Sequence, residues 1–180
     1  WYKRTLHTLF VPSVEMVRHI PRIAHQKCSA LPPGHSHPKI DAAHKTGDLK
    51  LFYVGGFSDY YQMGKLFSVL PEFPKIHCTI CTREAEWRQM QHAYPNIPSN
   101  LRVLFLSGSA MEEEMLNADI ALLFVKPDKY REFSMPLKLF EYIGYGLPII
   151  ASEGTLSAEV VKKYDIGWVI PYDAKKLGLL

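Results

Sequence analysis

A lysine and a glutamate, Lys138 and Glu141, stand three residues apart in the segment SMPLKLFEYIGYGLPIIAS, which runs from position 134 to position 152. Residues at this spacing share one face of a helix. A lysine ammonium is a compact cation that suits a phosphate, and a glutamate carboxylate accepts hydrogen bonds from sugar hydroxyls. By spacing alone the pair favours an ordinary ion pair on an exposed helix surface, and the alternative is a crevice that binds a phosphate and sugar hydroxyls.

The residues before this pair predict where their helix begins. Ser134 is a residue type that favours the N-cap, and Pro136 is favoured in a first helical turn, so we expect the helix to begin near Met135. The first amides of a helix lack intrahelical acceptors and attract anions. We therefore expect Ser134 and Pro136 to lie beside the same ligand as Lys138.

The chain from Lys50 onward alternates short apolar runs with amphipathic segments, a pattern typical of β-α-β units around a parallel sheet. Strands are predicted at residues 49–55, 75–81, 101–107, 119–125, 147–152 and 167–171. Helices are predicted between them, at residues 60–70, 83–94, 109–117, 136–146 and 156–165. The predicted fold class is α/β, with a Rossmann-like, doubly wound parallel sheet.

Two glycines, Gly55 and Gly56, follow the first of these strands. Ligands of doubly wound sheets bind beyond the carboxyl ends of the strands, where strand order reverses. Glycines at this place let the backbone approach a phosphate closely at the start of the next helix. The alternative is that they serve only a tight turn.

The first 48 residues differ from the rest of the chain. Residues 1–34 predict a strand, a helix and a short strand, and we expect them to be the remnant of a preceding N-terminal domain. Residues 35–48 are polar and predict a linker to a domain that covers residues 49–180. His35, His37 and His44 lie in this linker without the fixed spacing of a metal site, so we expect solvated side chains and no metal.

Composition excludes several classes of protein. The 180 residues carry a net charge of +3, which gives no basic surface typical of nucleic-acid binding. No apolar run approaches the roughly 18 residues of a membrane span, and no signal peptide is evident. Cys78 and Cys81 form a CxxC within a predicted strand, where residues three apart point to opposite faces, so we expect inert thiols in a reducing, cytoplasmic compartment.

The segment from Ser134 to Ser152 resembles the signature of retaining GT-B glycosyltransferases of the group 1 (family 4) type, in which a proline, a lysine, EY and a GxPII strand follow one another. The segments LFYVGGFSDYY, NADIALLF and LSAEVVKKYDIGWVIPYD occur in the order and spacing of that family. The resemblance covers most of residues 50–180, and VPSVEMVRHI through LPPG is similar to the last elements of the family's N-terminal domain.

The resemblance implies a C-terminal domain that binds the nucleotide-sugar donor, with roles for particular residues. Glu141 is then expected at the ribose hydroxyls, and Lys138 and Ser134 at the phosphate or sugar. The glycine turn is expected under the diphosphate, and the backbone after the third strand at the base. The residues implied beside these groups are Gly55, Gly56, Phe57 and Ser58 for the diphosphate and Phe105 and Leu106 for the base.

The chain departs from the family pattern at two places. Many members carry two glutamates separated by seven residues, and the first of these falls on Phe133, one position after Glu132. Many members also carry an arginine and a lysine just after the first glycine turn, and this chain has neither there. The residues that could replace this basic pair are Lys65, Arg83, Tyr60 and Tyr61.

The function that the resemblance implies is retaining transfer of a sugar from a nucleoside diphosphate to a glycan or lipid-linked acceptor, as in polysaccharide or glycoconjugate biosynthesis. No cofactor or metal is expected. The acceptor would be bound by the N-terminal domain, and the full-length protein could associate peripherally with the cytoplasmic face of a membrane. Two alternatives remain: a catalytically silent nucleotide- or carbohydrate-binding module, and a nucleotide-sugar epimerase on the same fold.

Overall fold

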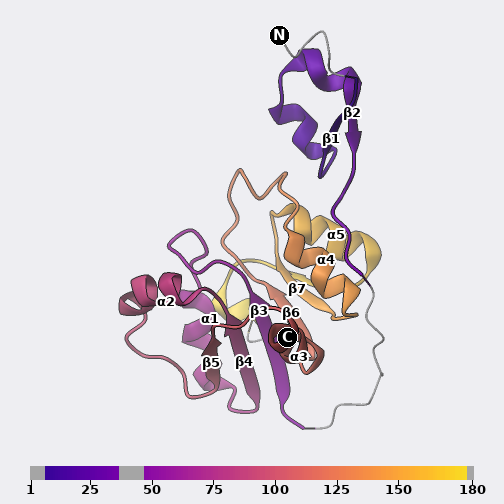
Figure 1. The fold of residues 1–180 in the computed structure, drawn as a ribbon. Coiled ribbons are helices and arrows are strands. Elements are labelled where there is room, and N and C mark those ends of the chain that lie inside the picture. The colour runs from indigo at the N-terminus through magenta and orange to yellow at the C-terminus, as the bar shows by residue number, and fades with distance from the viewer. Residues whose placement is uncertain (1–6, 37–46, 178–180) are drawn as a thin grey trace.

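The structure is a computed structural model that describes residues 7–36 and 47–177. Its centre is a parallel sheet of six strands in the order β5-β4-β3-β6-β7-β8 (Figure 1). The strands are β3 (Leu49–Val54), β4 (Ile76–Cys81), β5 (Leu101–Leu104), β6 (Ile120–Leu123), β7 (Ile149–Ser152) and β8 (Gly167–Ile170). Each lies within the range that the sequence predicts, and the doubly wound α/β class is confirmed.

Helices cover both faces of this sheet. They are α1 (Gly64–Val69), α2 (Glu84–Met90), α3 (Ser109–Leu116), α4 (Leu137–Gly144), α5 (Leu156–Tyr164) and α6 (Ala174–Leu177). Short 3₁₀ turns, η4 (Leu70–Glu72) and η5 (Gln91–Ala93), extend α1 and α2. Buried residues of α1 and α2 pack on one face, and those of α3, α4 and α5 pack on the other. The result is a three-layer domain with a hydrophobic core on each side of the sheet.

The two cysteines of the CxxC belong to different cores. Cys78 packs in the α1–α2 core and Cys81 in the α3–α5 core, because successive strand residues alternate between the two faces of the sheet. Burial raises the pKa of the Cys78 thiol to about 12. The prediction that these thiols cannot act as a pair is confirmed.

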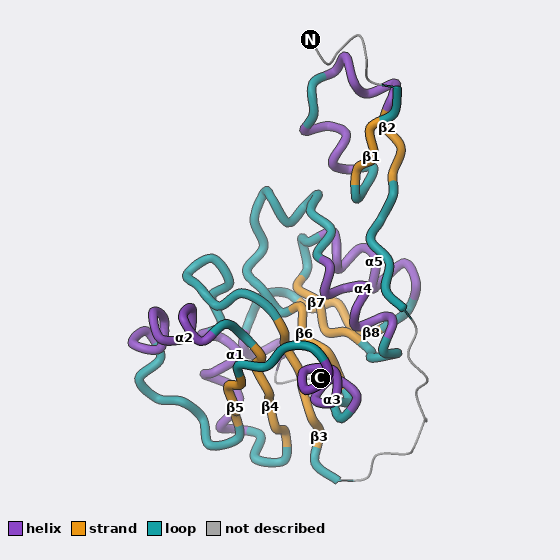
Figure 2. Tube along the Cα trace, in the orientation of Figure 1, coloured by secondary structure: helices purple, strands orange, loops and turns teal. Residues whose placement is uncertain are grey.

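The N-terminal residues form a separate small unit, drawn in indigo (Figure 1). Its elements are β1 (Leu9–Val11), the 3₁₀ turns η2 (Glu15–His19) and η3 (Arg22–Lys27), and β2 (Cys28–Ala30). β1 and β2 pair in parallel as a two-stranded sheet, apart from the six-stranded one (Figure 2). The predicted strand–helix–strand order is confirmed, except that the helix is two 3₁₀ turns, between which lies Pro21.

The linker histidines are only partly described. His35 lies over Gly144 at the end of α4, and its ring lies 5.5 Å from that of Tyr145. His37 and His44 lie outside the described residues. No group of three metal-ligating side chains occurs within residues 7–36 and 47–177. Across the same ranges, every helix is too short or too polar to cross a membrane.

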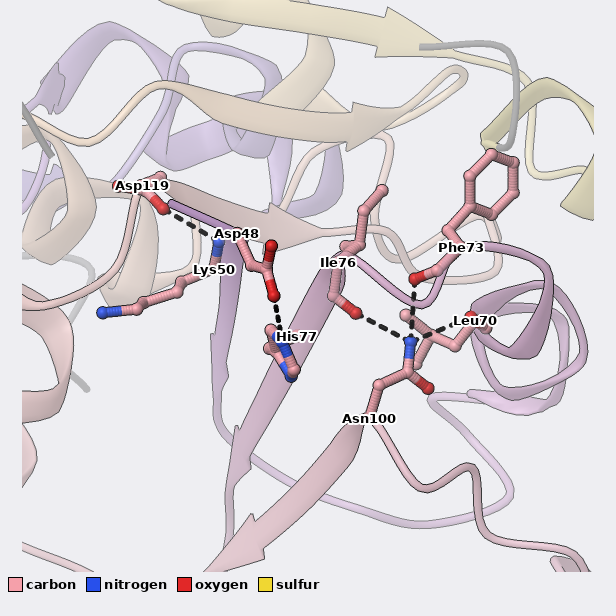
Figure 3. Close-up of polar contacts among 8 residues, drawn as sticks. All are labelled: Asp48, Lys50, Leu70, Phe73, Ile76, His77, Asn100 and Asp119. Carbon is pink, nitrogen blue, oxygen red and sulfur yellow. Dashed lines mark hydrogen bonds and ion pairs between the residues drawn. The ribbon is translucent and has the colours of Figure 1, made fainter. Parts of the chain in front are cut away.

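The amino edge of the sheet is fixed by polar contacts (Figure 3). The Asn100 side-chain amide, just before β5, donates to the carbonyls of Leu70, Phe73 and Ile76 at 2.9, 3.0 and 2.7 Å. Asn100 is buried, so these bonds compensate for the loss of its hydration. They join the end of α1, the following turn and β4 to β5, opposite the edge where ligands of such sheets bind.

Candidate functional site

The order of the strands places one candidate site at the carboxyl ends of β3 and β6. The chain winds outward from β3 through β4 to β5 and then returns to β6 on the other side of β3. The helices that follow the two central strands therefore diverge, and a crevice opens between the loops. Gly55 directly follows β3, and the β6–α4 loop carries Arg131 and Ser134. The structure thus brings together segments that are more than 70 residues apart in the sequence.

The two glycines are in close contact with side chains from the two sides of this crevice. Gly55 has φ +147°, a conformation that L side chains rarely adopt, and its amide donates to Cys81 O at 3.0 Å. A Cβ at Gly55 would overlap the Lys138 ammonium, and one at Gly56 would lie 2.5 Å from the ring of Tyr61. The φ of Gly55 requires glycine there, and a side chain at Gly56 would require the Tyr61 ring to move.

The predicted helix after this turn begins later than expected. α1 begins at Gly64, so the loop from Gly55 to Met63 separates the glycine turn from the first amides of α1. The expectation that the two glycines sit at the start of the next helix is wrong. An anion at this turn would instead meet the loop amides and the start of α4.

Lys138 points across the crevice toward β3. Its ammonium donates to the Tyr53 hydroxyl at 3.0 Å and lies 4.3 Å from the centre of the Tyr53 ring. Tyr53 is buried and donates in turn to Gly56 O at 2.8 Å. Among the described residues, Lys138 makes no ion pair with Glu141. The interpretation of these two residues as a simple surface pair is therefore wrong.

The surroundings of Lys138 weaken its hold on a proton. Burial lowers the pKa of the ammonium most, and the nearby positive charge of Arg131 lowers it further. The carboxylates of Glu141 and Glu86 oppose this effect, and the resulting pKa is about 8. An anion placed beside Lys138 would offset the cost of burying the charge and the repulsion from Arg131.

The start of α4 differs from the prediction. The helix begins at Leu137, and the residue in the capping position is Pro136, whose φ is −73° and ψ 138°. Ser134 is not the N-cap: its amide donates to Tyr130 O at 2.9 Å, as part of the turn before the helix. No side chain of the described chain caps the first amides of α4. The Leu139 amide donates to Pro136 O at 3.1 Å. The amides of Leu137 and Lys138 are therefore the ones available at the side of the crevice where Ser134 lies.

Arg131 is a site residue that the sequence analysis missed. Only 8% of it is exposed, and its guanidinium pairs with Asp128 and donates to Lys126 O at 2.9 Å and to Tyr60 O at 3.2 Å. The guanidinium carbon lies 3.9 Å from the centre of the Tyr60 ring. Arg131 therefore joins the β3–α1 loop to the β6–α4 loop. An arginine that follows no strand directly and belongs to no matched motif gave no signal in the sequence.

These residues enclose a cavity of about 90 Å³. It has the volume of a small group such as a phosphoryl, and two cationic side chains line it. The lining residues are Tyr60, Tyr61, Leu123, Val125, Tyr130, Arg131, Ser134, Pro136, Lys138, Thr155 and Ser157. The structure thus brings predicted Lys138, Ser134 and Pro136 together with Tyr60 and Tyr61, two of the residues considered as substitutes for the missing basic pair.

Phe57 and Arg83 take part in a second set of contacts beside the glycine turn. The Phe57 ring is buried in the α1–α2 core, and its amide donates to the Glu86 carboxylate at 2.7 Å. Arg83 is exposed and forms an ion pair with the same carboxylate. Burial alone would raise the pKa of Glu86, but the Phe57 amide and Arg83 outweigh it and lower the pKa. Of these groups, only Arg83 remains accessible to a ligand.

The other predicted residues lie around this crevice. Ser58 starts the turn that carries Tyr61, since its carbonyl accepts from the Tyr61 amide at 2.9 Å. Phe105 and Leu106 follow the carboxyl end of β5, with Phe105 45% exposed and Leu106 O accepting from the Cys81 thiol at 3.4 Å. Glu141 is half-buried on α4, one turn beyond Lys138. Phe105 and Leu106 are thus at the strand end two positions from β3, while Glu141 and Lys138 share one helix.

Phe133 connects this site to the N-terminal unit. Its ring stacks on that of His19 with 3.6 Å between centroids, and its carbonyl accepts from the Ser13 hydroxyl at 2.8 Å. Phe133 occupies the position where the first glutamate was expected, and Glu132 beside it is exposed. Glu132 and Phe133 are both absent from the lining of the cavity, so no carboxylate from these positions faces it.

Comparison with protein families gives a match over most of the chain. The model described as "Glycosyl transferases group 1" matches residues 38–177. No curated protein sequence matches the chain.

Solved structures of glycosyltransferases share the fold. Anabaena HepE, in complex with UDP and glucose, is 11% identical with a TM-score of 0.73, and the match covers 99% of this chain and 53% of that one. A glycosyltransferase from Rickettsia africae is 12% identical, with a TM-score of 0.73 and coverages of 99% and 55%. Sucrose-phosphate synthase from Thermosynechococcus elongatus is 16% identical, with a TM-score of 0.71 and coverages of 98% and 49%. The chain spans about half the length of these proteins.

Proposed function

Because the chain belongs to the glycosyl transferases group 1 family, we propose that it binds the nucleotide-sugar donor of a sugar-transfer reaction at the crevice between β3 and β6. The observation that carries this proposal is the pair of cations, Lys138 and Arg131, on one cavity beside the glycine turn. Since the expected arginine and lysine after that turn are absent, these two side chains supply the charge from the other side of the crevice. The UDP and glucose in the Anabaena structure support a nucleotide sugar as ligand.

The diphosphate would bind between the glycine turn and the start of α4. The amides of Leu137 and Lys138 and the Lys138 ammonium would hold one phosphate. The positive charge of Arg131 would attract it without direct contact, since its guanidinium is already paired. Gly55, Gly56 and Ser58 would let the backbone lie close to the other phosphate. Arg83, which is exposed, could turn toward it from the next loop.

The nucleoside would extend from the diphosphate toward α4 and β5. The Glu141 carboxylate, one helical turn from Lys138, would accept hydrogen bonds from the two ribose hydroxyls. The base would lie against Phe105, with the backbone near Leu106 as its polar partner. In this arrangement Glu141 orients the donor and takes no part in proton transfer.

The chemical step that we propose is departure of a nucleoside diphosphate as the sugar forms a bond to an acceptor oxygen. The bond from the anomeric carbon to the phosphate oxygen breaks, and negative charge develops on that oxygen. Lys138 and the α4 amides would stabilise this charge, which is how such sites lower the barrier. We propose retention of configuration at the anomeric carbon, which NMR of the product formed by the complete protein would test.

The acceptor side of the reaction would come from a preceding domain. We propose that residues 1–34 are the end of that domain and that residues 35–48 link it to the donor domain at residues 49–180. The N-terminal unit already contacts the loop before α4 through Ser13 and His19. We also propose a cytoplasmic location with a glycan or lipid-linked acceptor.

Calorimetric titration of the chain with UDP, GDP and ADP would test donor binding. We expect one of the three to bind and the corresponding nucleoside to bind more weakly, because the phosphates contact Lys138 and are attracted by the positive charge of Arg131. Absence of binding by all three would overturn the proposal. With nucleotide sugars, the chain alone should bind the donor and release no nucleoside diphosphate, since groups that exclude water would belong to the other domain.

A catalytically silent binding module is the second candidate, and one observation favours it. Phe133, in the position of the expected first glutamate, is engaged with His19 and Ser13, so that carboxylate is missing from the site. Donor hydrolysis or transfer by the complete protein would exclude this module. Binding without turnover, under conditions in which acceptors of several classes are offered, would favour it.

A further inference from the structure

We propose that the ring of Tyr60 is the platform on which the pyranose ring of the donor stacks, and that this residue contributes to selection of the sugar. The inference rests on the proposed donor site and extends it from the phosphates to the sugar. Tyr60 lines the same cavity as Lys138, and 46% of it is exposed. A large aromatic side chain at the edge of a cavity that also holds two cations, partly open to solvent, offers contact area that the core does not use.

The Tyr60 ring is held in one orientation from three sides. The Arg131 guanidinium stacks on one face at 3.9 Å, and Tyr61 meets the ring edge-on with 5.5 Å between centroids. The hydroxyl is engaged with the Asp128 carboxylate, which also pairs with Arg131. Because the guanidinium covers one face, a ligand would stack on the opposite face of the Tyr60 ring. The ring is thus preorganised, which reduces the entropy lost when a ligand stacks on it.

The position of Tyr60 suits the sugar rather than the nucleoside. In a nucleotide sugar, a single oxygen joins the sugar to its terminal phosphate, so the sugar lies next to that phosphate. Tyr60 shares the cavity with Lys138, whereas the residues proposed for the base, Phe105 and Leu106, follow β5. β5 is separated from β6 by two strands, so the nucleoside and the sugar would extend in opposite directions from the diphosphate.

The chemistry of the residue matches a pyranose. One face of a pyranose ring presents mainly C–H groups, which pack on the face of an aromatic ring, while the hydroxyls at its edge need polar partners. Ser134 and Ser157 line the cavity and could provide such partners. A tyrosine has few rotatable bonds, so it gives this contact at a low entropic cost.

The test compares two ligands that differ only by the sugar. Calorimetry measures the affinity of the protein for each nucleoside diphosphate and for a matching nucleotide sugar. The pairs are UDP and UDP-glucose, GDP and GDP-mannose, and ADP and ADP-glucose, and the proteins are the wild type, Tyr60→Ala and Tyr60→Phe. For the pair that binds, we expect Tyr60→Ala to lower the affinity for the nucleotide sugar about fivefold or more, as expected for loss of one stacking contact. The affinity for the diphosphate should fall less than twofold. Tyr60→Phe, which keeps the ring, should retain both affinities within about twofold.

Tyr164→Ala is the matched control, since Tyr164 is 61% exposed on α5 and does not line the cavity. It should change neither affinity. If Tyr60→Ala lowers the affinity for both ligands equally, or for neither, the proposed stacking role of Tyr60 is wrong, while the proposed donor site is unaffected. If the wild type binds no diphosphate, the donor site itself fails and the platform with it. Tyr60→Leu replaces Tyr60→Ala if the alanine variant does not fold, and the same difference between the two ligands is required of it.

Discussion

The Lys138 ammonium occupies the space that a side chain at Gly55 would need. The two residues come from different sides of the crevice, Gly55 from the end of β3 and Lys138 from the first turn of α4. Their contact sets the distance between the backbone of the glycine turn and the only lysine on the cavity among the described residues. Gly55 was predicted to lie under the diphosphate and Lys138 to face the phosphate or the sugar, and the structure brings the two residues into direct contact.

Gly55→Val should weaken binding of the nucleoside diphosphate more than binding of the nucleoside. The valine would displace Lys138 from Tyr53 and would be strained at φ +147°, at a cost of about 1–3 kcal/mol. Thermal unfolding measures the strain, and calorimetry measures the two affinities. Gly34→Ala is the control, because nothing lies within 4 Å of a Cβ there. Equal loss of both affinities would assign Gly55 to the turn alone.

Diphosphate affinity should fall as pH rises above about 8, the pKa of Lys138. The free protein then loses the lysine proton, and binding must take it up again, so the affinity falls by at most about tenfold per pH unit. Calorimetry between pH 7 and pH 10 follows this fall. Lys138→Met should bind more weakly at pH 7 and show no such dependence. A wild-type affinity that is constant across this range would contradict the role of Lys138.

The same pKa predicts how stability changes with pH. The pKa of Lys138 is lower in the folded chain than the ordinary value of 10.5, so the unfolded chain binds more protons between pH 8 and 10.5. The contribution of Lys138 to the free energy of unfolding therefore becomes more positive as pH rises through this window, which means that the folded state becomes more stable. Lys138→Met removes the cost of a buried charge, so its stability relative to the wild type should be greatest below pH 8. Denaturant unfolding at pH 7 and pH 10 would show the difference.

Glu141→Gln should lower the affinity for the nucleoside diphosphate and leave the melting temperature nearly unchanged. The substitution keeps the shape of the side chain but removes the charge from a hydrogen-bonded pair to the ribose, and such bonds contribute about 1.5–3 kcal/mol. Titration with UDP, GDP and ADP measures the loss of affinity. The 2′-deoxy form of the nucleotide that binds lacks one of the two hydroxyls, so the substitution should reduce its affinity by less. A variant with wild-type affinity would return Glu141 to a structural role.

Asn100→Asp should destabilise the domain by about 3 kcal/mol, because a carboxylate would face the three carbonyls that now accept from the side-chain amide. The introduced carboxyl favours its protonated form in the fold, so the deficit should grow as pH rises above about 4, the ordinary pKa of an aspartate. Denaturant unfolding at pH 4.5 and pH 7 tests this. Asn96→Asp, at an exposed position, is the control.

The sequence by itself determined the class of the fold and the identity of its main elements. Short apolar runs identified the strands, and apolar residues at three and four spacing identified the helices. The period of two within a strand placed Cys78 and Cys81 on opposite faces. These signals are local, because they follow from the geometry of one strand or one helix. The motif around Lys138 and Glu141 was also local, so its assignment to one helix could be made without the structure.

Only the tertiary structure decided which side chains meet at the site. Arg131 stacks on Tyr60 and Lys138 reaches Tyr53, across separations of 71 and 85 residues. Local periodicity contains no information on such contacts, since they depend on the strand order that brings β3 beside β6. The capping position of α4 was also decided this way: the Ser134 amide is bound within the preceding turn, so the helix begins after Pro136. Propensity identified a helix start nearby, but competition among the loop contacts fixed the residue.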